Sequence, residues 1–539
     1  MFFEKEIVMF ALPWGVRRAA CIGVAGVVAA LGAFPALAQT TVTAVMHAPL
    51  RGLDPVINSQ YIVRNYAYMV YDTLLARDAA NKIRPQMAER WTVSLDGKSI
   101  TFVLRDGLKW HDGTDVKAED CVASIRRWSA MDTMGQVMNT LLEGMTVVDD
   151  KTFEMKFKEP TEIALTALSK PSGLAAFMMP KRLADTPVSE PIKEELGSGP
   201  FRLVMSDFKP GVQAVFEKFK DYVPRSEPAS GMAGGKIVSV DRVKWVTMPD
   251  PMTAVNALLS KEIDLIEYVP YDLLSILEAN PGVVVKESKL RGNQSIARLN
   301  FSQSPFDNKL LRQAALLAID QKDQMQAQVG NPKYYKLCAA AFGCGGAYAS
   351  DIGADKVIKG QPEKAAELLK QAKYDGAPVV ILHATDVPAF AAMAPVVAQA
   401  LRKAGFNVQM RSMDWQTVAV SRASRAPVTN GGWSIFCTIN GLVDVGEPLG
   451  YNAASASGKS GYFGWPDVPA IEEARAKFAR TKDPEELKTI ATDLQRRILD
   501  EVLFIPLGEA YSVSAWRTDM APPLDTPVAV FWNFTRTGK

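Results

Sequence analysis

The first 38 residues decide which part of this chain has to fold, because they have the pattern of a cleavable secretory signal. Arg17 and Arg18 precede an apolar run over residues 19–34, and Ala36-Leu37-Ala38 supplies the small residues of a cleavage site before Gln39. The apolar run has sixteen residues, fewer than the ~20 that a helix needs to cross a bilayer. We therefore expect residues 1–38 to be removed as a signal peptide, and the mature protein to fold outside the cytoplasm.

The length and charge of the mature chain narrow its class. Removing 38 of the 539 residues leaves 501, and single cores stop growing near ~250–300 residues, so we expect two large lobes. The formal net charge is only +2, which gives no basic surface of the kind that phosphate binding requires, and no nucleic-acid partner is expected. No later segment reaches 18 consecutive apolar residues, so no membrane span is expected either.

Four cysteines remain after the leader. Cys338 and Cys344 are separated by five small or apolar residues, and an oxidising compartment favours joining them, so we predict one disulfide there. Cys121 and Cys437 lie in apolar surroundings and are expected to be free, buried residues. The three histidines form no pair with metal-ligand spacing, and neither a metal site nor a cofactor is predicted.

Alternating residues predict a small α+β subdomain in the first third of the chain. Residues 41–46 are β-prone and predict a first strand, while residues 100–104 and 153–157 alternate between apolar and polar side chains, as half-buried strands do. A helix is predicted from about Ala118, since Glu119 and Asp120 then lie where the helix dipole favours negative charge.

A second pattern predicts a parallel sheet in the later part of the chain. A helix from Pro362 precedes a buried strand at residues 379–382; a helix at residues 396–403 ends at Gly405, and a further strand follows at residues 406–410. Strand, helix and strand at this spacing are typical of a parallel α/β sheet.

Several short blocks occur in a fixed order over nearly all of the mature chain. They are Leu53-Asp54-Pro55, residues 70–75, residues 102–113 with Ala118-Glu119-Asp120, Gly197-Ser198-Gly199-Pro200-Phe201, residues 299–320 and Phe504-Ile505-Pro506-Leu507. Together they resemble the family 5 extracellular solute-binding proteins, the peptide and nickel receptors of bacterial ATP-driven importers.

The resemblance implies an α/β fold of the two-lobed type II periplasmic-binding-protein class (cluster C), with an extra α+β subdomain in lobe one. Residues 39–75, 190–292 and 508–539 would form the sheet domain of lobe I, residues 76–189 the extra subdomain, and residues 293–507 lobe II. The chain would cross between the lobes near residues 291–295 and 505–508.

The function implied by the resemblance is that of a monomeric periplasmic receptor, not an enzyme. It would capture a peptide or a peptide-like solute between two closing lobes and deliver it to an ABC permease and its ATPase in the inner membrane. A ligand closes such a receptor only through its differential affinity for the open and closed forms.

The resemblance also suggests where the ligand binds. Peptide-binding relatives add the peptide as a strand beside the segment that matches Gly432-Trp433-Ser434. An aspartate that often holds the peptide ammonium three residues after the tryptophan is here Phe436. Asp444 or Glu447 could replace it, although acidic residues in polar loops are more often simply solvated.

Arginines and aromatic residues complete the set of candidate ligand-binding residues. Arg51, Arg64 and Arg422 could hold a ligand carboxylate, or could be surface charges with buried stems. Trp433 suits either a ligand platform or core packing. Three tyrosines are expected in the core and not in the cleft: Tyr61, Tyr68 and Tyr71.

Three alternatives to a peptide receptor stay open. Because Phe436 removes the expected ammonium contact, the cargo could be a non-peptide solute such as an opine, a sugar derivative or an aromatic acid. The nickel branch is disfavoured, since His383 falls in a predicted buried strand, while His47 could reach the cleft from the end of the first strand. An exported hydrolase is a weaker alternative, because the chain has neither a Gly-x-Ser-x-Gly nor a His-Glu-x-x-His motif. The third open alternative is a sensor or chaperone that serves no importer.

Overall fold

The structure is a computed structural model that describes residues 40–537. The signal peptide predicted at residues 1–38 lies outside this range. None of the helices in the described range has the length and apolar character that crossing a membrane requires.

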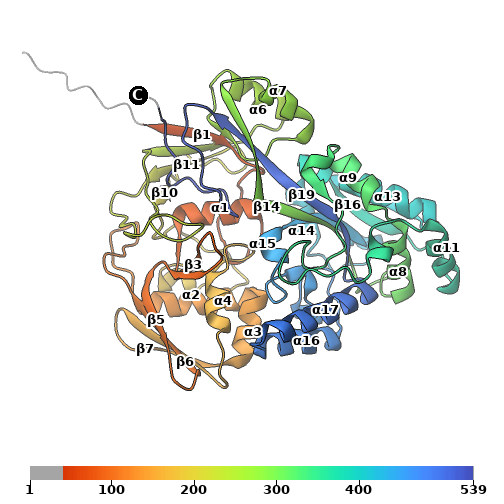
Figure 1. Cartoon of the computed structure of the whole chain (residues 1–539), viewed down its shortest axis with the longest axis horizontal. Helices are drawn as coiled ribbons and strands as arrows, with labels where there is room; N and C mark the ends of the chain where they lie inside the picture. Colours follow the sequence, from red (N-terminus) through yellow and green to blue (C-terminus); the bar gives the residue numbers. More distant parts are fainter. Residues whose placement is uncertain (1–39, 538–539) are drawn as a thin grey trace, which may run out of the picture. The chain divides into compact units, whose positions relative to one another are not determined.

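One large mixed sheet runs through the described residues (Figure 1). Its strands follow the order β10 (Phe201–Leu203), β11 (Gln213–Lys218), β12 (Arg242–Val246), β1 (Thr41–Val45), β13 (Leu265–Ile266), β19 (Phe504–Arg517), β14 (Val283–Leu299), β18 (Ile435–Gly441), β16 (Val379–Ala384) and β17 (Val408–Met413), with β15 (Tyr335–Lys336) paired to β19. We call the half that contains β1 lobe I and the half that contains β18 lobe II. Parallel pairs occur in both lobes, β12-β1-β13 in lobe I and β17-β16-β18 in lobe II.

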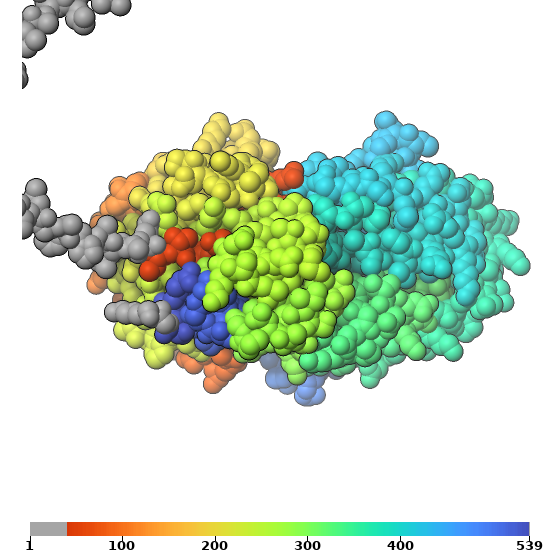
Figure 2. Space-filling model, turned by 90° about the horizontal axis from the view of Figure 1, so that it is seen from above, coloured from red at the N-terminus to blue at the C-terminus, as the bar shows by residue number. Residues whose placement is uncertain are grey.

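Two long antiparallel strands join the lobes. β14 and β19 pair from Val283↔Arg517 in lobe I to Arg298↔Phe504 in lobe II, and the pairing is interrupted between Ser288 and Asn293. Figure 1 shows these two ribbons crossing from one half of the molecule to the other. Figure 2 shows the yellow and green surface of lobe I meeting the cyan surface of lobe II along one boundary. The residue bounds predicted for the lobes stay a prediction.

Lobe I carries a separate α+β layer. Its four-stranded sheet has the order β5 (Ala88–Val93), β6 (Ser99–Leu104), β8 (Thr152–Phe157), β7 (Leu142–Val147), and the short pairs β2 (Asp72–Thr73) with β9 (Phe177–Met178) and β3 (Leu75–Arg77) with β4 (Ile83–Pro85) lie outside the large sheet. The helices of lobe I are α1 (Tyr61–Val70), α2 (Ala118–Met131), α3 (Thr133–Leu141), α4 (Ile163–Ser169), α5 (Lys181–Ala184), α6 (Pro251–Leu259) and α7 (Leu274–Glu278).

Lobe II contains the remaining helices. They are α8 (Lys309–Ala318), α9 (Gln321–Gln328), α10 (Ala354–Val357), α11 (Pro362–Gln371), α12 (Pro388–Ala391), α13 (Met393–Ala404), α14 (Trp415–Ser421), α15 (Leu442–Val445), α16 (Pro469–Arg480) and α17 (Pro484–Glu501). Buried apolar residues from α8 and α13 pack with those of β16 and β18 into one core, which fixes where the ends of these strands lie.

The predicted elements are confirmed, with shifts at two boundaries. Residues 100–104 and 153–157 are strands whose apolar side chains are the buried ones, and α2 begins at Ala118. α13 begins at Met393, earlier than predicted, since proline is tolerated in a first helical turn. β17 begins only at Val408, because Gly405 ends α13 in the left-handed conformation and two further residues carry the chain back to the sheet.

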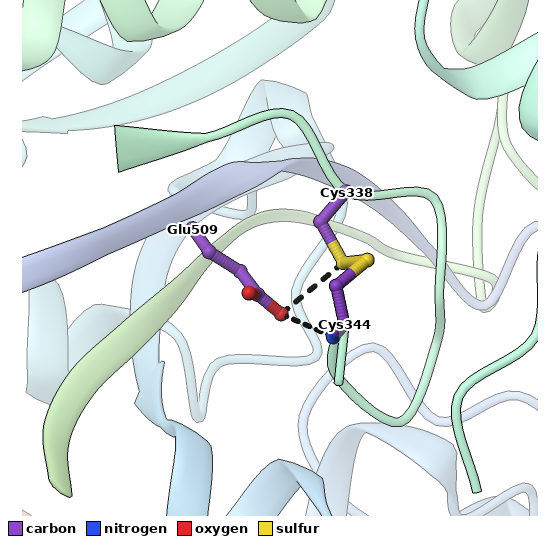
Figure 3. A group of neighbouring side chains, drawn as sticks. All are labelled: Cys338, Cys344 and Glu509. Atoms are coloured by element: carbon purple, nitrogen blue, oxygen red, sulfur yellow. Dashed lines mark hydrogen bonds between the residues drawn. A yellow bond between two sulfur atoms is a disulfide. The ribbon is translucent and has the colours of Figure 1, made fainter. Parts of the chain in front are cut away.

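The predicted disulfide is present. Cys338 and Cys344 are bonded, while Cys121 and Cys437 are free and buried. Glu509 of β19 holds the disulfide loop, because its Oε1 accepts a hydrogen bond of 2.7 Å from the backbone N–H of Cys344 and lies 3.1 Å from the Sγ of Cys338 (Figure 3). The loop is thus fastened to one of the two strands that join the lobes.

Breaking the disulfide should lower stability by a measurable amount. The bridge closes a short loop with a sequence separation of 6, and loop-closure entropy gives such a loop about 2 kcal/mol. We expect the double variant Cys338→Ser, Cys344→Ser to lose this amount in urea unfolding. A reductant should destabilise the wild type but not the variant, and equal sensitivity of both to the reductant would contradict the assignment.

Candidate functional site

Two adjoining hollows form a cavity between the lobes. Counting space that is open to solvent, the first spans about 770 Å³ and the second about 690 Å³. Both are lined by His47 and Tyr61 of lobe I and by Phe390 and Ile439 of lobe II. We call them the first and second hollow, and together the interlobe cavity.

The cavity lies where parallel strands end. β1 and β13 are parallel neighbours; His47 is the second residue after β1, and Glu267 is the first after β13. Open α/β sheets bind ligands outside the carboxyl ends of their parallel strands, because loops diverge there and leave a crevice. Ile439 reaches the cavity from β18 of lobe II, so strand ends of both lobes supply its walls.

A buried carboxylate anchors the lobe I wall. Oε2 of Glu267 accepts hydrogen bonds from the backbone N–H of His47 at 2.9 Å and from its Nδ1 at 2.7 Å, and Oε1 accepts one from Asn65 at 2.7 Å. Burial opposes ionisation of Glu267, but the contacts with His47 and the charge of Arg291 outweigh it and hold its pKa at about 2. Glu267 is therefore a fixed negative charge at neutral pH.

A second carboxylate links the lobes. Oδ2 of Asp444, in lobe II, accepts hydrogen bonds from the hydroxyl of Tyr61 at 2.7 Å and from that of Ser172 at 2.9 Å, both in lobe I. Ser172 in turn accepts a hydrogen bond from Nη1 of Arg64. Burial, together with the charge of Asp444, raises the pKa of Tyr61 well above its usual value, so the phenol remains a hydrogen-bond donor.

Arg422 is a buried cation at the wall of the first hollow. Its side chain donates long hydrogen bonds of 3.4 Å to Tyr462 and to Ser59 of lobe I, and its guanidinium carbon lies 4.6 Å from the ring centroid of Phe463. A further contact between the lobes is made by the side-chain amides of Gln60 and Gln416, at 2.8 and 3.0 Å. The interlobe cavity is thus closed by polar contacts that run from one lobe to the other.

One backbone edge of β18 is unpaired beside the cavity. β18 pairs with β14 along its full length but with β16 only at Ile435 and Phe436. The carbonyl of Ser434 accepts a hydrogen bond from the backbone N–H of Asn300, which follows β14, whereas the N–H of Gly441 at the other end of β18 donates to the hydroxyl of Tyr61. Alternate residues of a strand turn their backbone groups to the same side. Thr438 and Asn440 therefore turn their N–H and C=O groups towards β14, whereas Ile439 turns its groups to the side that β16 has left. Ile439 lines both hollows.

The candidate residues from the sequence fall into four places. Asp444 and Arg422 line the first hollow, and Arg64 lines the second. Arg51 lines a third hollow beside Gly211, which shares His47 with both hollows of the interlobe cavity, and Glu447 lines another beside Phe478. The remaining four are buried away from the cavity walls in lobe II: Gly432, Trp433, Ser434 and Phe436.

Packing explains why these four residues lie away from the cavity. Trp433 and Phe436 are fully buried against each other, with ring centroids 5.0 Å apart, and Ser434 exchanges hydrogen bonds with Val380 of the neighbouring strand. A side chain on Gly432 would collide with the carbonyl of Ala426. Their role in ligand binding stays a prediction that these contacts do not support.

Tyr61 corrects one expectation from the sequence. It was expected in the core with Tyr68 and Tyr71, which are indeed buried, but it lines both hollows. Tyr61 is the first residue of α1, where the helix enters from the cavity side, whereas the other two lie further into lobe I. Sequence reasoning did not single out Arg291 or Asn440, whose side chains carry no motif.

The comparisons with known proteins agree with this architecture. A probable peptide ABC transporter periplasmic-binding protein, y4tO of Sinorhizobium fredii (strain NBRC 101917 / NGR234), is 37% identical over 489 residues, covering 90% of this chain and 91% of its own. DppA of Helicobacter pylori in complex with the peptide STSA has a TM-score of 0.77 at 20% identity. The PBP AgaA of A. tumefaciens R10 in complex with agropinic acid has a TM-score of 0.75 at 21% identity. Each similarity covers 93% of this chain and 99% of the solved chain.

The sheet has two halves that are joined by two long strands, with a cavity between them. This architecture is that of a two-lobed binding protein of the periplasmic type II class, as predicted. The sequence model described as bacterial extracellular solute-binding proteins, family 5 Middle, matches residues 82–461. The chain belongs to this family of solute-binding proteins, and the resemblance stated from its sequence is confirmed.

The Glu267 carboxylate should make the free energy of unfolding depend on pH in the acid range. Its pKa falls from 4.5 to about 2 on folding, which at ~1.36 kcal/mol per unit corresponds to about 3 kcal/mol. Because the folded pKa is depressed, this stability is present above the unfolded pKa and is lost as the pH falls from about 4.5 towards 2. We expect Glu267→Gln to lower the free energy of unfolding at pH 7 and to remove this part of the acid dependence.

Urea unfolding at a series of pH values measures this effect. Glu473→Gln, which changes an exposed glutamate of α16, is the matched control and should behave as the wild type. An unchanged acid dependence in Glu267→Gln would show that the network with His47 and Asn65 does not hold the carboxylate in its charged form.

Proposed function

We propose that this protein is the periplasmic receptor of an ABC importer for peptides, and that the interlobe cavity is its ligand-binding site. The relative with 37% identity supports both the transport role and the peptide cargo, since it is described as a probable peptide ABC transporter periplasmic-binding protein. The signal pattern of residues 1–38 supports export from the cytoplasm. The ABC permease and its ATPase are the proposed partners.

The unpaired edge of β18 in the cavity is the observation that carries the peptide assignment. An extended peptide can add to such an edge, where main-chain hydrogen bonds provide affinity without regard to side chains. Ile439 presents these groups, and the aromatic residues Tyr61, Phe390 and Trp415 in the same hollow offer apolar surface to the peptide side chains. Asp444 is the proposed partner of the peptide ammonium group.

We propose a receptor without bond chemistry. The two carboxylates at the cavity already accept hydrogen bonds from protein donors, Glu267 from His47 and Asn65 and Asp444 from Tyr61 and Ser172. Such groups act as fixed charges that orient a ligand. A peptide in contact with both walls lowers the free energy of the closed form only, and this difference is what drives closure.

A thermal-shift screen with di- and oligopeptides tests the proposal. A peptide that binds the folded protein at 100 times its Kd adds about 2.7 kcal/mol to stability and raises the melting temperature. Small-angle scattering should show a more compact protein in its presence. If peptides leave the melting temperature unchanged while sugar derivatives or aromatic acids raise it, the cargo is a non-peptide solute, and turnover of a bound compound would indicate a hydrolase.

Substitution can show which of the two candidate carboxylates, Asp444 or Glu447, binds the peptide ammonium group. Asp444→Asn should weaken peptide binding by about tenfold or more, because a charge-assisted hydrogen bond to the ammonium group contributes about 1.5–3 kcal/mol. Glu447→Gln should leave the affinity unchanged, because Glu447 lines a different hollow. Isothermal titration of one peptide with both variants measures this, and an effect confined to Glu447→Gln would place the ammonium site elsewhere.

A further inference from the structure

The charges at the interlobe cavity do not balance. The first hollow is lined by Arg422 and Asp444, and the second by Arg64, Arg291 and Glu267. Three guanidinium groups against two carboxylates leave one positive charge in excess. Buried charge is costly unless it is paired, so the ligand is the remaining source of negative charge.

The two carboxylates are already engaged by the protein. Glu267 is held by His47 and Asn65, and Asp444 is held by Tyr61 and Ser172. Arg64 donates to the same Ser172 hydroxyl and so belongs to the Asp444 network. The two other arginines, Arg291 and Arg422, are left without a comparable anion.

Arg422 lacks an anionic partner in the described part of the chain. No carboxylate oxygen of residues 40–537 lies within 4.0 Å of its guanidinium, although the side chain is only 6% exposed. Its three hydrogen bonds are long, at 3.3 Å to Ala419 and 3.4 Å to Tyr462 and Ser59. A carboxylate in the first hollow could make shorter, charge-assisted bonds, preferably to two guanidinium nitrogens at once.

Arg291 presents the corresponding situation in the second hollow. Its Nε is buried without a hydrogen-bond partner among residues 40–537. Glu267 and Asp525 act on it only from beyond ion-pair distance, since no carboxylate oxygen in that range lies within 4.0 Å of its guanidinium. A buried donor without an acceptor costs free energy that a ligand acceptor would recover.

A third polar group at the cavity is also a hydrogen-bond donor that lacks an acceptor. Nδ2 of Asn440 is buried without a partner in the described range and belongs to a residue that lines the first hollow. Among the described cavity-lining residues, the buried side-chain atoms without partners are thus the Nε of Arg291 and the Nδ2 of Asn440, and both are donors. A ligand rich in acceptors satisfies them, whereas a second ammonium group would not.

We infer that the ligand is a net-anionic solute with two carboxylate groups, one bound by Arg422 in the first hollow and the other by Arg291 in the second. The inference rests on the proposed function, which it narrows from peptides in general to peptides with an acidic side chain. Such a dipeptide carries one ammonium and two carboxylates. Its net charge of −1 cancels the excess positive charge of the cavity, which a neutral dipeptide leaves in place.

Calorimetry with a matched pair of dipeptides tests this inference. Gly-Glu and Gly-Gln have nearly the same shape and differ by one carboxylate, so their relative affinity reports on the second anion site. We expect Gly-Glu to bind at least about tenfold more tightly, the equivalent of ~1.4 kcal/mol. Arg291→Gln and Arg422→Gln should each reduce this preference, while melting curves show whether the variants are folded. Arg425→Gln, which changes an exposed arginine three residues beyond Arg422, should retain it.

The outcomes separate this inference from the proposed function. Equal affinities for Gly-Glu and Gly-Gln would contradict the proposed site for a second carboxylate, but they would still agree with a peptide receptor. If neither dipeptide binds, N-acetylglutamate and N-acetylglutamine supply a pair without an ammonium group. A preference for N-acetylglutamate would then support the anionic ligand and overturn the peptide assignment. Absence of binding by all four compounds, or a preference that survives both arginine substitutions, would overturn the inference.

Discussion

The antiparallel pairing of β14 with β19 is the constraint on which the remaining structure depends. These strands are the shared edge of two half-sheets, so the parallel strands of lobe I and those of lobe II are built on one continuous hydrogen-bond ladder. The ladder is interrupted between Ser288 and Asn293, and Arg291, which lines the second hollow, lies in this interruption. A break in pairing removes backbone hydrogen bonds that would resist bending, so the same segment positions a cavity residue and permits a change of angle between the lobes.

The secondary structure could be read from the sequence where side-chain periodicity determines burial. Residues 100–104 alternate in sequence and in burial, and the helix that ends at Gly405 stops because glycine adopts the left-handed conformation at low cost. The disulfide was also predictable, since Cys338 and Cys344 are close in sequence and their neighbours are small. These features depend on local chemistry, which a single sequence contains.

The cavity was less predictable, because its walls depend on where distant strands end. Asp444, Arg422 and Arg64 were candidates and line the cavity, but Trp433 and Phe436 are core residues. Phe436 lies where β18 still pairs with β16 and Trp433 lies just before that strand, whereas Ile439 lies where the two strands have separated. Nothing in the local sequence marks this separation.

Closure of the lobes exchanges one set of hydrogen bonds for another. In the open form, Asp444 and Tyr61 would each be hydrated, and in the closed form they bond to each other across the lobes. Because water replaces such bonds well, the exchange contributes little net free energy by itself. The excess charge of Arg291 and Arg422 works against closure, since burying a cation without its counterion is costly. In the proposed receptor, a ligand that brings the missing negative charge would remove this cost only when both hollows are closed around it, so the same two arginines would govern both the selectivity for cargo and the closure of the lobes.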